Sequence, residues 1–94
     1  MANRRNVKKD VLFFIEEVLE DCLIFLTLHQ EKEYPEVEEI IDDMELLYQE
    51  AIYRVNHVDA EGKKNTKKHF DDIYNMVLDG VHDAFGRLSK LAKA

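Results

Sequence analysis

Residues 11–28 constrain the fold most, because they form the longest apolar block in the chain. The block reads VLFFIEEVLEDCLIFLTL, contains no Gly or Pro, and is interrupted by two acidic pairs, Glu16-Glu17 and Glu20-Asp21. At about 100° per residue, its apolar side chains fill half of a helical wheel, which is wider than a surface helix needs. The block therefore predicts a helix that packs against more than one neighbour.

Three helices are predicted, over residues 7–30, 35–58 and 66–92. Asn6 is expected to be the N-cap of the first, and Pro35 fits the first position of the second. Apolar residues in the second and third segments recur at alternating spacings of four and three, as in a bundle seam. The core is expected to contain Val11, Leu12, Phe14, Ile15, Val18, Leu19, Cys22, Leu23, Phe25, Leu26, Val37, Ile41, Met44, Tyr48, Ala51, Val55, Val58, Phe70, Tyr74, Val77, Val81, Ala84, Leu88 and Leu91.

The connections over 31–34 and 59–65 are short, so neighbouring helices are expected to run antiparallel. No stretch alternates as a strand would. The predicted fold is an all-α, three-helix up-down-up antiparallel bundle, one domain over residues 1–94, that can pair into a dimeric helical bundle. Gly80 lies at the edge of the apolar stripe of the third helix, where it would allow close helix approach. Gly86 lies on the outer side, where it would mark a kink.

Composition narrows the classes of function. The net charge of −7 argues against general affinity for nucleic acids or anionic membranes. The acidic pairs inside the apolar block exclude a membrane-spanning helix or a signal peptide there. The single cysteine, Cys22, excludes an internal disulfide and fits a reducing compartment, so a buried, inert thiol in a cytoplasmic protein is expected.

Several large apolar residues fall outside the predicted core. Phe13, Ile24 and Leu28 align with Glu17 and Glu20 on the far side of the first helix. On the second helix, Leu46 and Tyr53 lie one heptad apart on the back. Scattered surface apolar residues are one interpretation. The other, which we favour, is a contact surface for a homodimer or a protein partner. The predicted interface is Phe13, Glu17, Ile24, Leu28, Leu46 and Tyr53, and the function is that of a non-catalytic interaction or structural module without a cofactor.

A basic end offers an alternative. In an up-down-up bundle, the first and third helices begin at the same end, which gathers eight of the 13 Lys and Arg residues. Lysines in a first turn oppose the helix dipole, so helix formation does not explain them. An anion- or nucleic-acid-binding site is the functional interpretation, and two solvated basic segments are the simpler one. The residues are Arg4, Arg5, Lys8, Lys9, Lys63, Lys64, Lys67 and Lys68.

Groups that would form a known catalytic motif are scarce. The histidines, at 29, 57, 69 and 82, form no HExxH motif, Ser89 is the only serine, and there is no glycine-rich phosphate loop. His57 and His69 flank the second connection near Asp59, which makes them a minor candidate for a metal, but no metal site is expected.

Two short acidic motifs provide a second alternative. Residues 16–20 read E-E-x-x-E, and residues 39–42 read E-x-x-D. This order on successive helices resembles the magnesium site of the all-α nucleotide pyrophosphatases. The resemblance implies that the carboxylates hold Mg²⁺, which bridges a triphosphate and activates water. Both motifs face away from the predicted core, so a shared site would need a second subunit. The residues are Glu16, Glu17, Glu20, Glu39 and Asp42.

Overall fold

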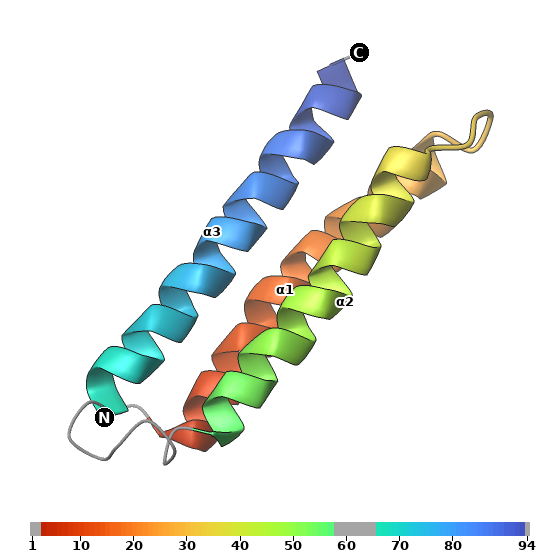
Figure 1. The fold of residues 1–94 in the computed structure, drawn as a ribbon. Coiled ribbons are helices and arrows are strands. Elements are labelled where there is room, and N and C mark those ends of the chain that lie inside the picture. The colour runs from red at the N-terminus through yellow and green to blue at the C-terminus, as the bar shows by residue number, and fades with distance from the viewer. Residues whose placement is uncertain (1–2, 58–65, 94) are drawn as a thin grey trace.

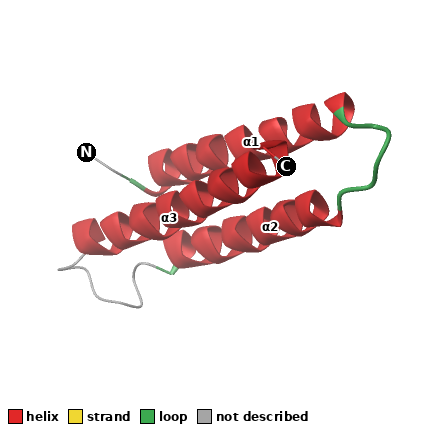
Figure 2. Ribbon diagram, turned by 90° about the horizontal axis from the view of Figure 1, so that it is seen from above, coloured by secondary structure: helices red, strands yellow, loops and turns green. Residues whose placement is uncertain are grey.

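The computed structural model describes residues 3–57 and 66–93, which form an all-α bundle of three helices (Figure 1). Helix α1 spans Arg4–Leu28, α2 spans Pro35–Asn56 and α3 spans Thr66–Lys93. Each helix packs against both of the others. Helices α1 and α3 begin at the same end and α2 runs the opposite way, and the described residues contain only helices and loops (Figure 2). The predicted three-helix up-down-up bundle is confirmed.

The start of α1 differs from the prediction. Asn3, not Asn6, is the N-cap, because the Asn3 side chain accepts a hydrogen bond of 2.9 Å from the backbone N–H of Asn6. The helix therefore begins at Arg4 and includes the basic residues that were expected to precede it. At its other end α1 stops at Leu28, two residues before the predicted end.

The other two helices start where the sequence predicts, at Pro35 and Thr66. Acidic residues occupy the first turn of α2, where the positive end of the helix dipole favours them. Helix α2 ends at Asn56, and its predicted end at Val58 lies outside the described residues, as does the second connection. Helix α3 ends at Lys93, one residue beyond the prediction.

The core is a single cluster to which all three helices contribute. Most predicted members are buried or partly buried, and Val7, Ile40 and Ile73 are buried although they were not expected. The prediction is wrong for Leu12 and Leu23, which are 41% and 65% exposed. The reason is that α2 and α3 both meet α1 on one narrow face. The buried residues of α1 are Val7, Val11, Ile15, Val18, Cys22 and Phe25.

Polar contacts tie the helices together along their length. At the end where α2 starts, Arg87 of α3 donates to Asp43 at 2.8 Å and to Glu39 at 3.1 Å, both on α2. At the opposite end, the Tyr74 hydroxyl of α3 donates to the carboxylate of Asp10 on α1 at 2.6 Å. These contacts fix how far each helix is shifted along its neighbour.

The two glycines of α3 differ in their surroundings. A Cβ atom on Gly80 would lie 2.6 Å from Cδ2 of Leu47, so this glycine permits the close approach of α2 that the sequence predicts. A Cβ atom on Gly86 would meet nothing within 4 Å. Gly86 therefore has no packing role among the described residues, and α3 continues without interruption through both positions.

Substituting the two glycines should therefore give different results. Gly86→Ala should raise the free energy of unfolding by about 1 kcal/mol, because alanine loses less backbone entropy in a helix. Gly80→Ala should raise the free energy of unfolding clearly less, or lower it, because Leu47 must move to admit the new methyl group. Chemical denaturation of the two variants beside the wild type measures the difference. Equal stabilisation by both would contradict the close-approach role of Gly80.

A second prediction concerns Tyr74 and pH. Two effects, of which burial is the larger and the hydrogen bond to Asp10 the next, raise the pKa of Tyr74 from its ordinary value of 10.0 to about 12. Because the folded-state pKa is the higher one, this contribution to stability is full below pH 10 and disappears as the pH rises through 12. In a near-ultraviolet titration, Tyr74→Phe should remove one tyrosinate signal near pH 12, and Asp10→Asn should move that signal to lower pH. Loss of a signal near pH 10 in Tyr74→Phe would contradict this account.

Candidate functional site

The outer side of α1 carries a row of residues that the core does not cover. We call Phe13, Glu17, Glu20, Ile24 and Leu28 the α1 stripe. Phe13 is 58% exposed, Ile24 is 56% exposed and Leu28 is 70% exposed, although all three are large and apolar. The structure places every residue of the stripe outside the core, on the helix whose opposite face packs against both α2 and α3.

The C-terminal half of the stripe lies between two shallow depressions. One, of about 330 Å³, is lined by α1 alone and includes Leu23 and Thr27. The other, of about 350 Å³, is a groove between α1 and α3 that includes Phe85 and Ala92. Ile24 and Leu28 line both, so they form the ridge between them. This part of α1 is therefore apolar on its outer face as well as its inner one.

The N-terminal half of the stripe consists of Phe13 and its neighbours. The Phe13 ring meets Phe14 edge to face, with 5.8 Å between the ring centroids, and Phe14 packs against the core. Helices α1 and α3 run parallel, and the hydrogen bond between Asp10 and Tyr74 joins residues 64 apart. The same offset places Leu78, which is also exposed, level with Phe14. Leu78 belonged to no predicted surface, because a single residue beside a seam gives no periodic signal.

Carboxylates separate the two apolar halves of the stripe. Glu16, Glu17, Glu20 and Asp21 are exposed, and the ion pairs of the described residues involve none of them. The middle of α1 is therefore a band of negative charge without a cation from its own described chain. Any partner that covers the whole stripe must accommodate this band.

The remaining predicted interface residues lie on α2. Leu46 and Tyr53 are exposed and line a depression formed by α2 residues only. The Tyr53 ring also stacks on His57, with the ring centroids 3.9 Å apart. This depression shares no lining residue with those beside the α1 stripe. The structure therefore divides the predicted interface into two patches, one on α1 and one on α2.

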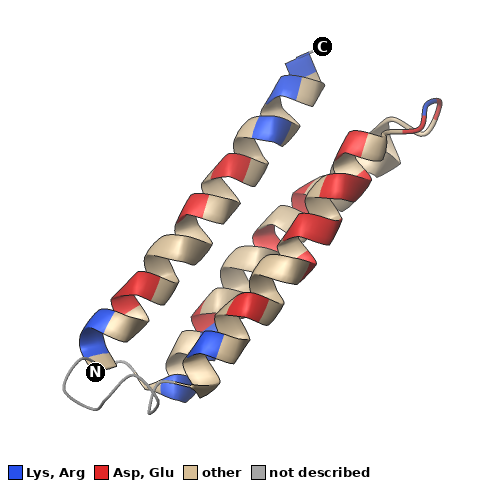
Figure 3. Ribbon diagram, in the orientation of Figure 1, with Lys and Arg blue, Asp and Glu red and all other residues tan. Residues whose placement is uncertain are grey.

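The basic end forms as the topology predicts, since α1 and α3 begin side by side (Figure 3). Lys68 forms an ion pair of 3.4 Å with Asp72 in the next turn, and Asp10 lies among the lysines of α1. Lys63 and Lys64 lie outside the described residues. The described members of this group are Arg4, Arg5, Lys8, Lys9, Lys67 and Lys68.

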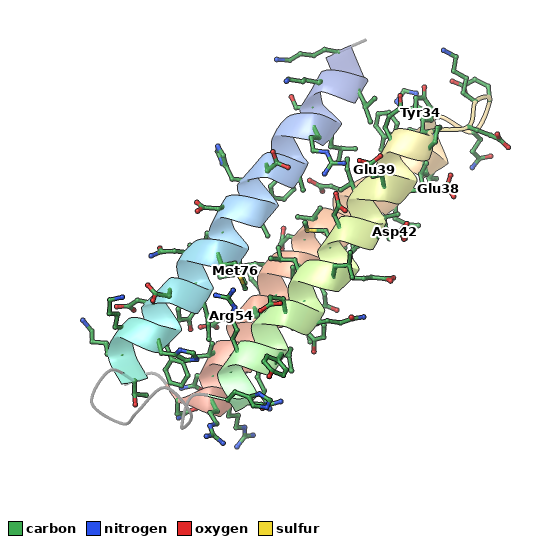
Figure 4. All side chains as sticks on the ribbon, viewed as in Figure 1. Tyr34, Glu38, Glu39, Asp42, Arg54 and Met76 are labelled. Carbon is green, nitrogen blue, oxygen red and sulfur yellow. The ribbon has the colours of Figure 1, made fainter. Side chains whose placement is uncertain are left out.

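The opposite end of the molecule is acidic on its α1 and α2 side. Figure 4 places Glu38, Glu39 and Asp42 near the start of α2, close to Tyr34. Glu31 and Glu33 lie in the connection that precedes α2. The end of α3 is basic, with Lys90 and Lys93 in its last turn. Charge is therefore separated along α1 and α2, and less so along α3.

The acidic motifs that resemble a magnesium site stay apart within one chain. Glu16, Glu17 and Glu20 are exposed on α1, and the carboxylate of Glu39 on α2 is held by Arg87. Among the described residues there is no group of three or more His, Cys, Asp or Glu side chains placed to share a metal ion. Gathering the two motifs around one ion would need a second subunit, as the sequence predicts.

The histidines beside the second connection have structural contacts. His69 Nε2 lies 2.7 Å from the backbone oxygen of Arg54, which ties the start of α3 to the end of α2. His57 Nδ1 lies 2.7 Å from the backbone oxygen of Tyr53. Both ring nitrogens therefore contact backbone oxygens of α2. Asp59, their predicted companion, lies outside the described residues.

Cys22 is fully buried in the core. Burial of the thiol, and to a smaller extent the nearby Asp21 carboxylate, raises the pKa of Cys22, which keeps the thiol protonated and unreactive.

His29 lies at the far end of α1, where its ring packs against Phe25 and Tyr34. The groups that could attack a substrate are thus dispersed or enclosed among the described residues.

No helix among the described residues combines the length and apolarity that crossing a membrane requires. Comparison of the chain with models of known protein families, with curated proteins and with solved structures found no match. The most unusual feature of the described surface is the α1 stripe.

Proposed function

We propose that the protein is a non-catalytic interaction module that pairs with a second copy of itself through the α1 stripe. The observation that carries this proposal is the exposure of Phe13, Ile24 and Leu28 on one side of one helix. A helix that is apolar on both its inner and outer sides is normally enclosed on both. Within a single chain, α2 and α3 cover only the inner side.

The size of the chain adds to the case. A domain of 94 residues buries a smaller fraction of its surface than a larger one, so it has more to gain from association. Full burial of a side chain such as Phe, Ile or Leu contributes about 1.5–3 kcal/mol. Association costs about 4–15 kcal/mol in lost freedom of motion. Because these side chains are 56–70% exposed in the single chain, covering three of them on each copy contributes about 5–11 kcal/mol, which offsets the lower part of that range.

A second copy is the occupant that we favour because it supplies an equally apolar stripe and the opposite charges. Arg5, Lys8 and Lys9 lie at one end of α1, and Glu31 and Glu33, with Lys32 between them, follow its other end. The surface of one copy therefore offers both the apolar area and the cations that another copy needs.

The lone, buried Cys22 suits a reducing compartment, and we propose the cytoplasm as the location of the protein.

The proposal predicts the effect of reversing the polarity of the stripe. Phe13→Glu combined with Ile24→Lys should convert a dimer into a folded monomer, because both side chains are exposed in the single chain and needed only for pairing. Sedimentation velocity or light scattering gives the mass, and circular dichroism reports the helix content.

The matched control is Leu46→Lys combined with Tyr53→Glu, on α2. It also changes two exposed apolar residues and also leaves the net charge unchanged. This variant should keep the mass of the wild type. A wild type that is a folded monomer at high concentration would overturn the proposal. Dissociation by the α2 variant alone would move the pairing surface to α2.

A further inference from the structure

This inference rests on the proposed pairing and concerns its geometry. We infer that the two copies pair with their α1 helices antiparallel, about a two-fold axis beside Glu17 and Glu20, so that Phe13 of each copy faces Ile24 of the other. Charge order along α1, the spacing of the apolar residues and the acidic band of the stripe lead to this arrangement.

The charges of α1 follow a fixed order. Arg5, Lys8 and Lys9 come first and are followed by Asp10, the carboxylates of residues 16–21 come next, and Glu31, Lys32 and Glu33 follow the helix. In a parallel two-fold pair every residue lies beside its own copy, so each of these groups would meet the same charge. In an antiparallel pair the basic start of one α1 lies at the same end as the connection of the other, where Glu31 and Glu33 outnumber Lys32. The order of charge therefore favours the antiparallel pair, and so do the opposed helix dipoles.

The apolar residues fix the register. Phe13 and Ile24 are eleven residues apart in sequence. A two-fold axis level with the midpoint between residues 18 and 19 therefore places Phe13 of each copy opposite Ile24 of the other. Eleven residues are about three helical turns, so both side chains point to nearly the same side of the helix. The exposed ridge formed by Ile24 and Leu28 then covers the exposed Phe13 ring of the second copy.

This register has one unfavourable region, because the acidic bands of the two copies meet at the axis and Glu16 of each copy lies level with Asp21 of the other. Glu17 of each copy lies beside Glu20 of the other, on the axis and away from the basic residues. Both carboxylates are exposed in the single chain, and the repulsion between them in the pair lowers the gain from covering the apolar residues without cancelling it. The repulsion provides a test, because removing one of these charges should tighten the pair.

Disulfide trapping tests the orientation. Phe13→Cys and Ile24→Cys should cross-link efficiently when mixed, because a disulfide needs Cα atoms about 4.4–6.8 Å apart. Each variant alone should cross-link poorly, since eleven residues of helix separate the two identical cysteines by about 16 Å. The wild type is the control, because its only thiol, Cys22, is fully buried. Cross-linking of either variant alone that equals that of the mixture would overturn the antiparallel pair.

A charge variant supplies a second measurement that leaves the apolar contacts intact. Glu17→Gln should lower the dissociation constant of the pair by about two- to fivefold, whereas Glu45→Gln, at an exposed position on α2, should not. Weaker pairing of Glu17→Gln would show that the carboxylate has a cationic partner, which contradicts the register. A monomeric wild type with no cross-link in any mixture would instead overturn the proposed function, so the two failures are distinguishable.

Discussion

The structure depends on the narrow face of α1 that meets both other helices. Six residues of α1, spaced four or three apart, supply its buried surface, and α2 and α3 converge on them. A half-wheel of apolar side chains is more than this face can accommodate, so Leu12 and Leu23 at its margin remain exposed. The apolar residues opposite the face, Phe13, Ile24 and Leu28, remain more than half exposed. One packing constraint thus produces both the core and the uncovered stripe.

Polar contacts then set the positions of helices that the apolar core alone would leave free to slide. Arg87 binds carboxylates on α2 near one end, and Tyr74 binds Asp10 on α1 nearer the other. Each contact joins residues that are far apart in sequence, so a shift of one helical turn would break it. Since α1 and α3 are held parallel and in a defined offset, the exposed residues of both helices lie at fixed levels along the same side. A partner that bound this side would therefore meet a rigid surface.

The sequence predicts the helix count, the topology and most of the core, because periodic apolar residues and short connections leave few other arrangements. It misplaces details that depend on neighbouring helices. Ile40 and Ile73 lie beside the regular four-three seam, and each is buried because its helix lies between two others. Asn3 and Asn6 are equally good caps by residue type. Only the hydrogen bond between them shows that the helix begins at the earlier one. The α1 stripe was predictable since it is periodic, whereas its separation from Leu46 and Tyr53 depends on how α1 and α2 pack.

The position of Cys22 has a consequence for measuring the motions of this molecule. Its side chain is fully buried in the core that α1 shares with α2 and α3, so a reagent in solution can reach it only after the bundle opens. The rate at which a thiol reagent modifies the native protein therefore reports how often the bundle opens, without any added label. Because the chain carries no other thiol, each modification event records the opening of that one site.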